Sequence, residues 1–267
     1  MTFSLSKFNI FISTLNFVLC FVGYQLATSL FLPISSDLEA ISQTVTIPYR
    51  GFALLISILV LILNLKKKIG KLPLALGIFW IYWIALIIRI FYDIFLRSDV
   101  NLNSSSQLWL YIFGIILITM FSIIKSYTKI DLEKALKWVY LGTALTMILS
   151  LFNNASLLID SSEITGRASG NIALQTISFG HLGTMGIALS LFILKKGRIN
   201  FTKKIFIILI MILSFLIMIR AGSRSPVLAL AVIILFWMFA RSKNVARGSF
   251  IAISIIILIL IFMEPKT

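Results

Sequence analysis

The sequence predicts an all-α, polytopic integral membrane protein with about nine transmembrane helices and a cytoplasmic N-terminus. Hydrophobic residues make up 60% of the 267 residues and charged residues 12%, whereas a soluble domain is nearer half apolar and a quarter charged. The mean hydropathy is +1.05, which excludes both a soluble globular enzyme and a disordered chain. Apolar runs recur along the whole chain, and each spanning helix needs roughly 20 apolar residues.

Nine apolar runs account for the predicted helices, taken in chain order. The first is too long for the apolar part of a secretory signal, and no small-residue cleavage site follows it, so it reads as an uncleaved span. The eighth is short and could extend into its flanks. Neither a repeat nor a low-complexity linker interrupts the chain, which predicts a single transmembrane domain over residues 1–267. The runs cover residues 8–32, 47–65, 74–96, 108–124, 138–159, 171–194, 205–219, 226–240 and 249–263.

The basic residues predict the orientation of these helices. With the N-terminus inside, 17 lysines and arginines fall on inner segments and six on outer segments, while Arg89 lies within a span. Inner segments of membrane proteins are typically enriched in this way. The net charge of +15 therefore orients the protein and contacts anionic lipids, and it is not the footprint of a nucleic-acid partner. The single cysteine, Cys20, excludes an internal disulfide.

The outer cations differ in kind from the inner ones, because five of the six are arginines. Arginine binds phosphate and carboxylate groups through two parallel hydrogen bonds. This asymmetry predicts a site for an anionic headgroup on the outer face. The alternative is that these arginines extend to the interface and pair with nearby carboxylates.

The segment Arg220–Pro226 gives the strongest local signal, between the seventh and eighth runs. Pro226 suits the first position of the eighth helix, and Ser225 suits the N-cap before it. Gly222 allows a tight bend. Arg220 and Arg224 would then converge on the positive end of a helix dipole, which is a favourable place for an anion. The alternative is a plain helical hairpin with interfacial arginines.

His181, the chain's single histidine, lies in the sixth run among glycines spaced three apart, at 180, 183 and 186. Such glycines let neighbouring helices approach closely. A polar residue at membrane depth is a candidate for function, so His181 could bind substrate or act as a base. The alternative is a packed histidine that bonds to a neighbouring helix.

Four further residues attract attention. Arg167 lies in the outer loop 154–170 just above the sixth run, and Arg50 follows Tyr49 at the outer start of the second run. In the third run Arg89 and Asp93 are four residues apart. They fall on one helical stripe, which predicts a structural ion pair. With one histidine and one cysteine the chain offers no cluster of metal ligands, and it carries no phosphate-binding loop or Ser-His-Asp motif.

The motifs resemble a known family. Ser-Arg-Ser-Pro-Val-Leu-Ala-Leu at 223–230 resembles the Ser-Arg-small-small-apolar signature of the bacterial O-antigen ligase and O-antigen polymerase superfamily. Gly-Arg-Ala-Ser-Gly at 166–170 is similar to the family's second recognisable stretch, and Tyr49-Arg50 fits the head of an early span. The resemblance covers residues 160–240, and it extends to the rest of the chain by hydropathy alone.

The resemblance implies a glycosyltransferase of the bacterial inner membrane that uses no nucleotide sugar, metal or cofactor. Such enzymes take a glycan from an undecaprenyl-pyrophosphate carrier at the periplasmic face and transfer it to lipid A core or to a growing glycan. By motif position Arg224, then Arg220 and Arg167, and with them Arg50, would bind the pyrophosphate. Fixed guanidinium groups would stabilise the charge that develops on this leaving group.

The chain also departs from the family. Family members continue into a large periplasmic loop and further helices, so the resemblance implies that this chain is an N-terminal portion. The family's histidine lies in that loop, and His181 is not matched to it. The motifs leave open ligase or polymerase, the sugar and the acceptor. Two other functions stay open: a non-enzymatic transporter or flippase of an anionic lipid, for which inverted repeats are typical, and an inactive truncated family member.

Overall fold

A computed structural model describes residues 4–31, 42–69, 73–95, 112, 116–153, 176–195, 199–222 and 224–241. Within these ranges the chain is helical and contains no strand. Five helices are long and apolar enough to cross a membrane: Leu5–Phe31, Thr44–Asn64, Leu132–Phe152, Ile177–Lys195 and Phe201–Arg220. The predicted all-α membrane fold is confirmed at this level, whereas the count of nine spans and the orientation of the N-terminus stay predictions.

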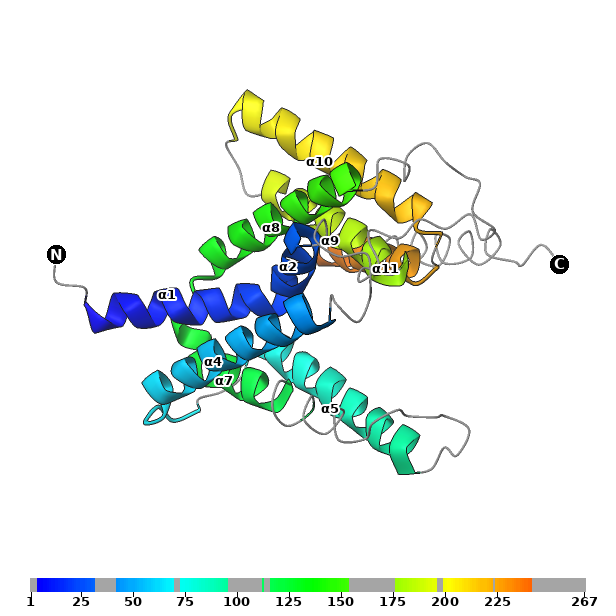
Figure 1. Ribbon diagram of the computed structural model, residues 1–267. Helices are drawn as coiled ribbons and strands as arrows, with labels where there is room; N and C mark the ends of the chain where they lie inside the picture. Colours follow the sequence, from blue (N-terminus) through cyan, green and yellow to red (C-terminus); the bar gives the residue numbers. More distant parts are fainter. Residues whose placement is uncertain are drawn as a thin grey trace. The chain divides into compact units, whose positions relative to one another are not determined.

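Figure 1 labels the helices in chain order. The third predicted run forms α5. Part of the fourth run lies outside the described residues, and the end of that run belongs to α7. The ninth run, residues 249–263, lies outside the described residues. Among the elements of the described residues, the π-helical turns η1 and η3 and the 3-10 turn η5 accompany the α-helices. The bounds are α1 (Leu5–Val18), η1 (Leu19–Gly23), α2 (Tyr24–Phe31), η3 (Ser42–Thr46), α4 (Ile47–Asn64), α5 (Leu74–Phe95), α7 (Ile118–Ser126), η5 (Tyr127–Lys129), α8 (Leu132–Asn153), α9 (Thr176–Lys195), α10 (Phe201–Arg220) and α11 (Arg224–Arg241).

The chain divides into two compact units. Unit 1 comprises Met1–Tyr24 and Ser42–Val139, and unit 2 comprises Gln25–Ile41 and Tyr140–Thr267. Each unit is built from apolar helices. One membrane domain over residues 1–267 stays a prediction.

In unit 1 a row of buried polar side chains joins α1, α4 and α7. Asn16 donates from Nδ2 to the Ser122 hydroxyl at 2.7 Å, and its Oδ1 accepts from Ser57 at 2.8 Å. Asn9 and Asn64 exchange two amide hydrogen bonds, 3.2 and 3.1 Å long. Polar groups in apolar surroundings need such partners, and in membranes they hold helices together. This polar seam consists of Asn9, Ser13 and Asn16 of α1, Ser57 and Asn64 of α4, and Ser122 of α7.

Replacing Asn16 by Val should loosen unit 1, because Asn16 is 1% exposed and two buried hydroxyls lose a partner. We expect a loss of about 1 kcal/mol in the free energy of unfolding. A double-mutant cycle with Ser57→Ala, followed by unfolding in mixed micelles, measures the coupling. A coupling energy indistinguishable from zero would show that the seam does not hold the helices.

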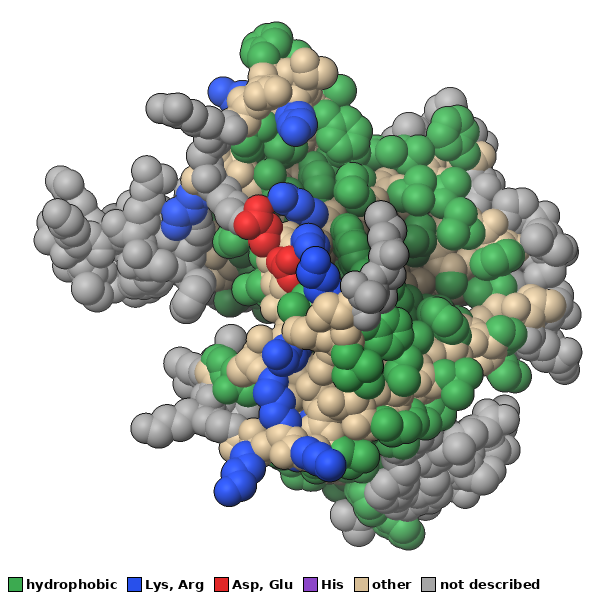
Figure 2. Space-filling view, turned by 90° about the vertical axis from the view of Figure 1, so that its left-hand side faces the viewer, with side chains coloured by type: hydrophobic (Ala, Val, Ile, Leu, Met, Phe, Trp, Pro, Cys, Tyr) green, Lys and Arg blue, Asp and Glu red, His purple; other side chains and the backbone are tan. Residues whose placement is uncertain are grey.

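Lysines gather at one end of unit 1, where α4 and α7 end and α8 begins. Lys125 donates to the backbone carbonyl of Lys67 at 2.8 Å, and the Lys67 ammonium group also bonds the Thr128 hydroxyl. Burial lowers the pKa of Lys67, and the neighbouring charge of Lys129 lowers it further. Figure 2 views the molecule from this side, where blue side chains gather. The predicted separation of the basic residues into inner and outer segments stays a prediction.

Asp131 makes the stability of the folded protein depend on pH at this end of unit 1. Its carboxylate accepts the Lys134 backbone N–H at 3.1 Å and pairs with the Lys134 ammonium at 3.2 Å, and these contacts lower the pKa of Asp131 below its usual 3.8. The folded pKa is the lower one, so its contribution is complete above the unfolded pKa and is lost as the pH falls. We expect Asp131→Asn to lose less thermal stability than the unsubstituted protein between about pH 5 and about pH 3. Equal losses, measured by melting at each pH, would contradict this.

In unit 2, α9 and α10 form a closely packed helical hairpin. A Cβ atom on Gly183 would lie 2.5 Å from the backbone oxygen of Ser214, and one on Gly186 would collide with the Ser214 hydroxyl. The predicted role of these glycines in close helix approach is confirmed. Around them the core of the unit is buried, and it comprises Tyr140, Ala144, Met147, Phe179, Leu182, Ile207, Ile210 and Ile217.

Candidate functional site

The turn between α10 and α11 carries the arginine motif. After α10 the N–H of Ala221 donates to Ile217 at 2.9 Å, and that of Gly222 donates to Ile219 at 3.0 Å. Gly222 has a φ of +56°, a left-handed conformation that glycine adopts without steric cost. The tight bend predicted at Gly222 is confirmed.

The start of α11 differs from the prediction. The helix begins at Arg224, two residues before the predicted first helical position at Pro226, so Ser225 lies inside the helix and is not its N-cap. Proline fits there because the first four N–H groups of a helix have no partner within it. Pro226 is buried, and Arg224 and Ser225 are exposed.

His181 meets this turn directly. Its Nε2 lies 3.0 Å from the Ser225 hydroxyl oxygen. One turn further along α9, the Thr184 hydroxyl donates to the backbone oxygen of Pro226 at 2.9 Å. Gly180 makes this approach possible, because a Cβ there would lie 2.6 Å from the Pro226 ring. The partner of His181, which sequence reasoning did not assign, is therefore Ser225, and the contact joins α9 to the first turn of α11.

Arg220 and three lysines lie at opposite ends of the α9–α10 hairpin. Arg220 closes α10 and is half-buried, whereas Lys203 and Lys204 lie in its first turn and Lys195 closes α9. The end with Arg220 and Arg224 also carries the exposed imidazole of His181. Two guanidinium groups can bind an anion there, and a neutral imidazole can accept a proton. We call Arg220, Arg224, Ser225 and His181 the arginine end of unit 2.

The other predicted site residues belong to unit 1 or lie outside the described residues. Arg50 belongs to unit 1, where it is exposed at the start of α4. Arg167 lies outside the described residues, as does the side chain of Asp93. The Arg89 guanidinium carbon lies 5.7 Å from the centre of the Tyr92 ring, at a distance typical of a cation–π contact. The ion pair between Arg89 and Asp93 stays a prediction.

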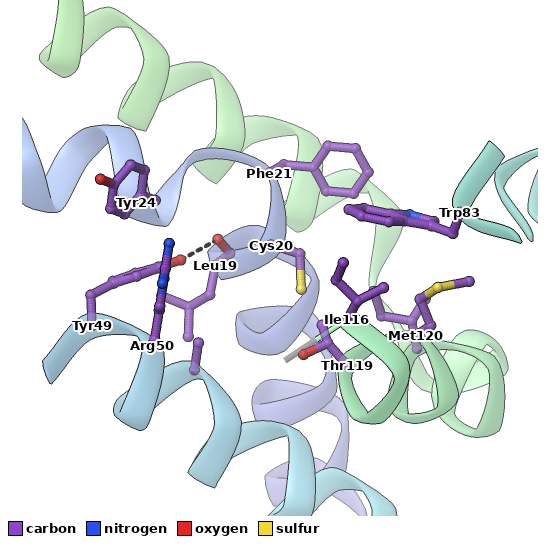
Figure 3. A pocket seen from close by; sticks show the side chains of 12 residues that line it. Leu19, Cys20, Phe21, Tyr24, Tyr49, Arg50, Trp83, Ile116, Thr119 and Met120 are labelled. Carbon is purple, nitrogen blue, oxygen red and sulfur yellow. Dashed lines mark hydrogen bonds between the residues drawn. The ribbon is translucent and has the colours of Figure 1, made fainter. Parts of the chain in front are cut away.

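Arg50 lines a cavity of about 430 Å³ in unit 1. Figure 3 shows Tyr49 and Arg50 on one side of this cavity, Trp83 on the other, and Cys20 between them. The sequence pointed to Tyr49 and Arg50, but it missed Cys20 and Trp83. Each stands within a long apolar run, and periodicity does not distinguish a cavity wall from a lipid-facing side chain.

Comparison with known proteins does not assign the chain to a family. No family model matches the chain, and neither a curated protein nor a solved structure matches it. The resemblance to the O-antigen ligase and polymerase superfamily therefore rests on the motifs at 166–170 and 223–230. The chain belongs among membrane proteins built from apolar helices.

Proposed function

We propose that the protein transfers or polymerises glycan from an undecaprenyl-pyrophosphate carrier at the periplasmic face of the bacterial inner membrane. The observation that carries this proposal is the arginine end of unit 2, where the His181–Ser225 contact of 3.0 Å fixes α9 against the helix start that bears Arg224. The acceptor is the lipid A core or a growing glycan, and the protein works as a ligase or a polymerase.

The chemistry of the transfer needs an anion site and a proton acceptor. As the bond between sugar and pyrophosphate breaks, negative charge develops on the leaving group, and Arg224 and Arg220 stabilise it. The acceptor hydroxyl loses its proton when it attacks the sugar. His181 is the candidate acceptor of that proton at this end of unit 2. Arg167 and Arg50 remain further candidates for the pyrophosphate.

The proposed transfer is tested by deleting the coding sequence in the source cell and examining its surface glycans on a gel. Loss of the long chains in the glycan ladder, restored by the intact gene, supports the transferase. An unchanged ladder together with altered lipid export would contradict it and favour the transporter or flippase. An unchanged ladder with unchanged export is the result expected of an inactive family member.

A further inference from the structure

A π-helical turn forms part of the wall of the unit 1 cavity, and a second one lies just before the helix that carries Tyr49 and Arg50. The first turn, Leu19–Gly23, places Leu19, Cys20 and Phe21 in the wall. The second, Ser42–Thr46, leads into α4, whose first residues include Tyr49 and Arg50. Turns of this kind are rare and often occur at functional sites. They draw attention to this cavity, which the steps proposed for Arg220, Arg224 and His181 do not involve.

One side of the cavity is polar and rigidly built. The Tyr49 hydroxyl donates to the backbone oxygen of Leu19 at 2.6 Å. It passes over Gly23, where a Cβ atom would lie 2.5 Å from that hydroxyl. Tyr24 packs beside it, with ring centres 5.7 Å apart, and its hydroxyl lies 3.3 Å from that of Thr46. These contacts fix the first turn of α4, and Arg50 is the next residue.

The other side is apolar. Trp83 of α5 faces Ile116, Met120 and Ile123, which come from the α7 segment. The mostly apolar wall with a few polar groups at one side is typical of sites that bind small molecules, and the volume falls in their usual range. Among the described residues that line the cavity, Arg50 is the one that carries a charge.

We propose that this cavity binds an anionic amphiphile with one hydrocarbon chain, such as an alkyl phosphate or a fatty acid. The chain lies against the wall formed by Trp83, Ile116 and Met120, and the acidic head pairs with Arg50. A cation or a neutral head gains no such pair, and a free phosphate ion gains no apolar contact. The test of this inference measures binding to the cavity alone, so it succeeds or fails whether or not the protein transfers glycan.

Cys20 provides the readout, because it is the chain's single cysteine, it is exposed and it lines the cavity. The full chain in nanodiscs of zwitterionic lipid is treated with N-ethylmaleimide, and the labelling rate of Cys20 is measured by mass spectrometry. Dodecyl phosphate, dodecyltrimethylammonium and inorganic phosphate are the three probes. We expect dodecyl phosphate to slow labelling at least fivefold, and the other two probes to leave the rate within twofold.

Two charge-neutralising variants in unit 1 complete the test. Arg50→Gln should weaken protection by dodecyl phosphate roughly tenfold or more in concentration. Arg89→Gln removes an exposed cation of α5 that does not line the cavity. In this variant dodecyl phosphate should protect Cys20 as well as it does in the unsubstituted protein. The proposal is overturned if dodecyl phosphate leaves labelling unchanged or if either other probe protects equally. It is also overturned if dodecyl phosphate protects Cys20 in Arg50→Gln as fully as it does in Arg89→Gln.

Discussion

Replacing Arg224 by Gln is expected to abolish glycan transfer while the protein still inserts into the membrane. Arg224 is exposed in the first turn of α11, next to the Ser225 that contacts His181. Losing one donor to a developing anion typically costs about 10²- to 10³-fold in rate, which is enough to remove long chains from a glycan ladder. The measurement pairs that ladder with an immunoblot of the membrane fraction.

Two matched variants separate the site from general effects of charge. Arg224→Lys keeps the charge but loses the planar pair of donors, so we expect an intermediate ladder. Lys203→Gln removes a cation at the opposite end of the same hairpin and should leave the ladder unchanged. A full ladder from Arg224→Gln at normal membrane levels would refute the role of Arg224.

Replacing Gly183 by Ala should destabilise unit 2, because it adds a methyl group inside the tight contact between α9 and α10. The new Cβ would stand 2.5 Å from the Ser214 backbone oxygen and 3.2 Å from the Met218 backbone nitrogen. Backbone atoms of a helix cannot rotate away, so the two helices must separate. Overpacking of this kind costs about 1–3 kcal/mol. Thermal unfolding of the purified protein in one fixed lipid mixture measures the loss.

The matched controls for Gly183→Ala are two other helical glycines, Gly51 and Gly77, where an added Cβ meets nothing within 4 Å. There Ala should be neutral or should stabilise by about 0.5–1 kcal/mol, because it restricts the unfolded chain. If Gly183→Ala melts at the same temperature as Gly77→Ala, the tight contact between α9 and α10 is not what stabilises unit 2.

The long apolar helices were the part of the fold that could be predicted from the sequence. The runs at 8–32, 47–65 and 205–219 correspond to the helices Leu5–Phe31, Thr44–Asn64 and Phe201–Arg220, because a lipid environment selects long apolar segments. The start of α11 was predicted less well. Capping rules placed Ser225 outside the helix, but its hydroxyl meets His181, 44 positions away in the sequence.

Contacts between distant polar residues could not be predicted. Asn16 finds Ser57 and Ser122, which are 41 and 106 positions away, and in the sequence each is one polar residue inside or beside an apolar run. The π-helical turn at Leu19–Gly23 leaves no periodic mark either, since its own five residues, Leu-Cys-Phe-Val-Gly, include no charged or amide side chain. The cavity that depends on this turn therefore became visible in the structure alone.

The polar seam of unit 1 is electrically neutral. Its members are amides and hydroxyls, which carry no charge at any physiological pH, so forming or breaking their hydrogen bonds moves no net charge across the membrane field. The contribution of the seam to the cohesion of α1, α4 and α7 is therefore insensitive to voltage, salt and acidity, because each of these acts on charge. The lysines at the end of the same unit are charged, and the hydrogen bonds that Lys67 and Lys125 make there weaken as salt is added. Two kinds of contact therefore join α4 to the α7 segment, and salt weakens one of them while it leaves the seam unchanged.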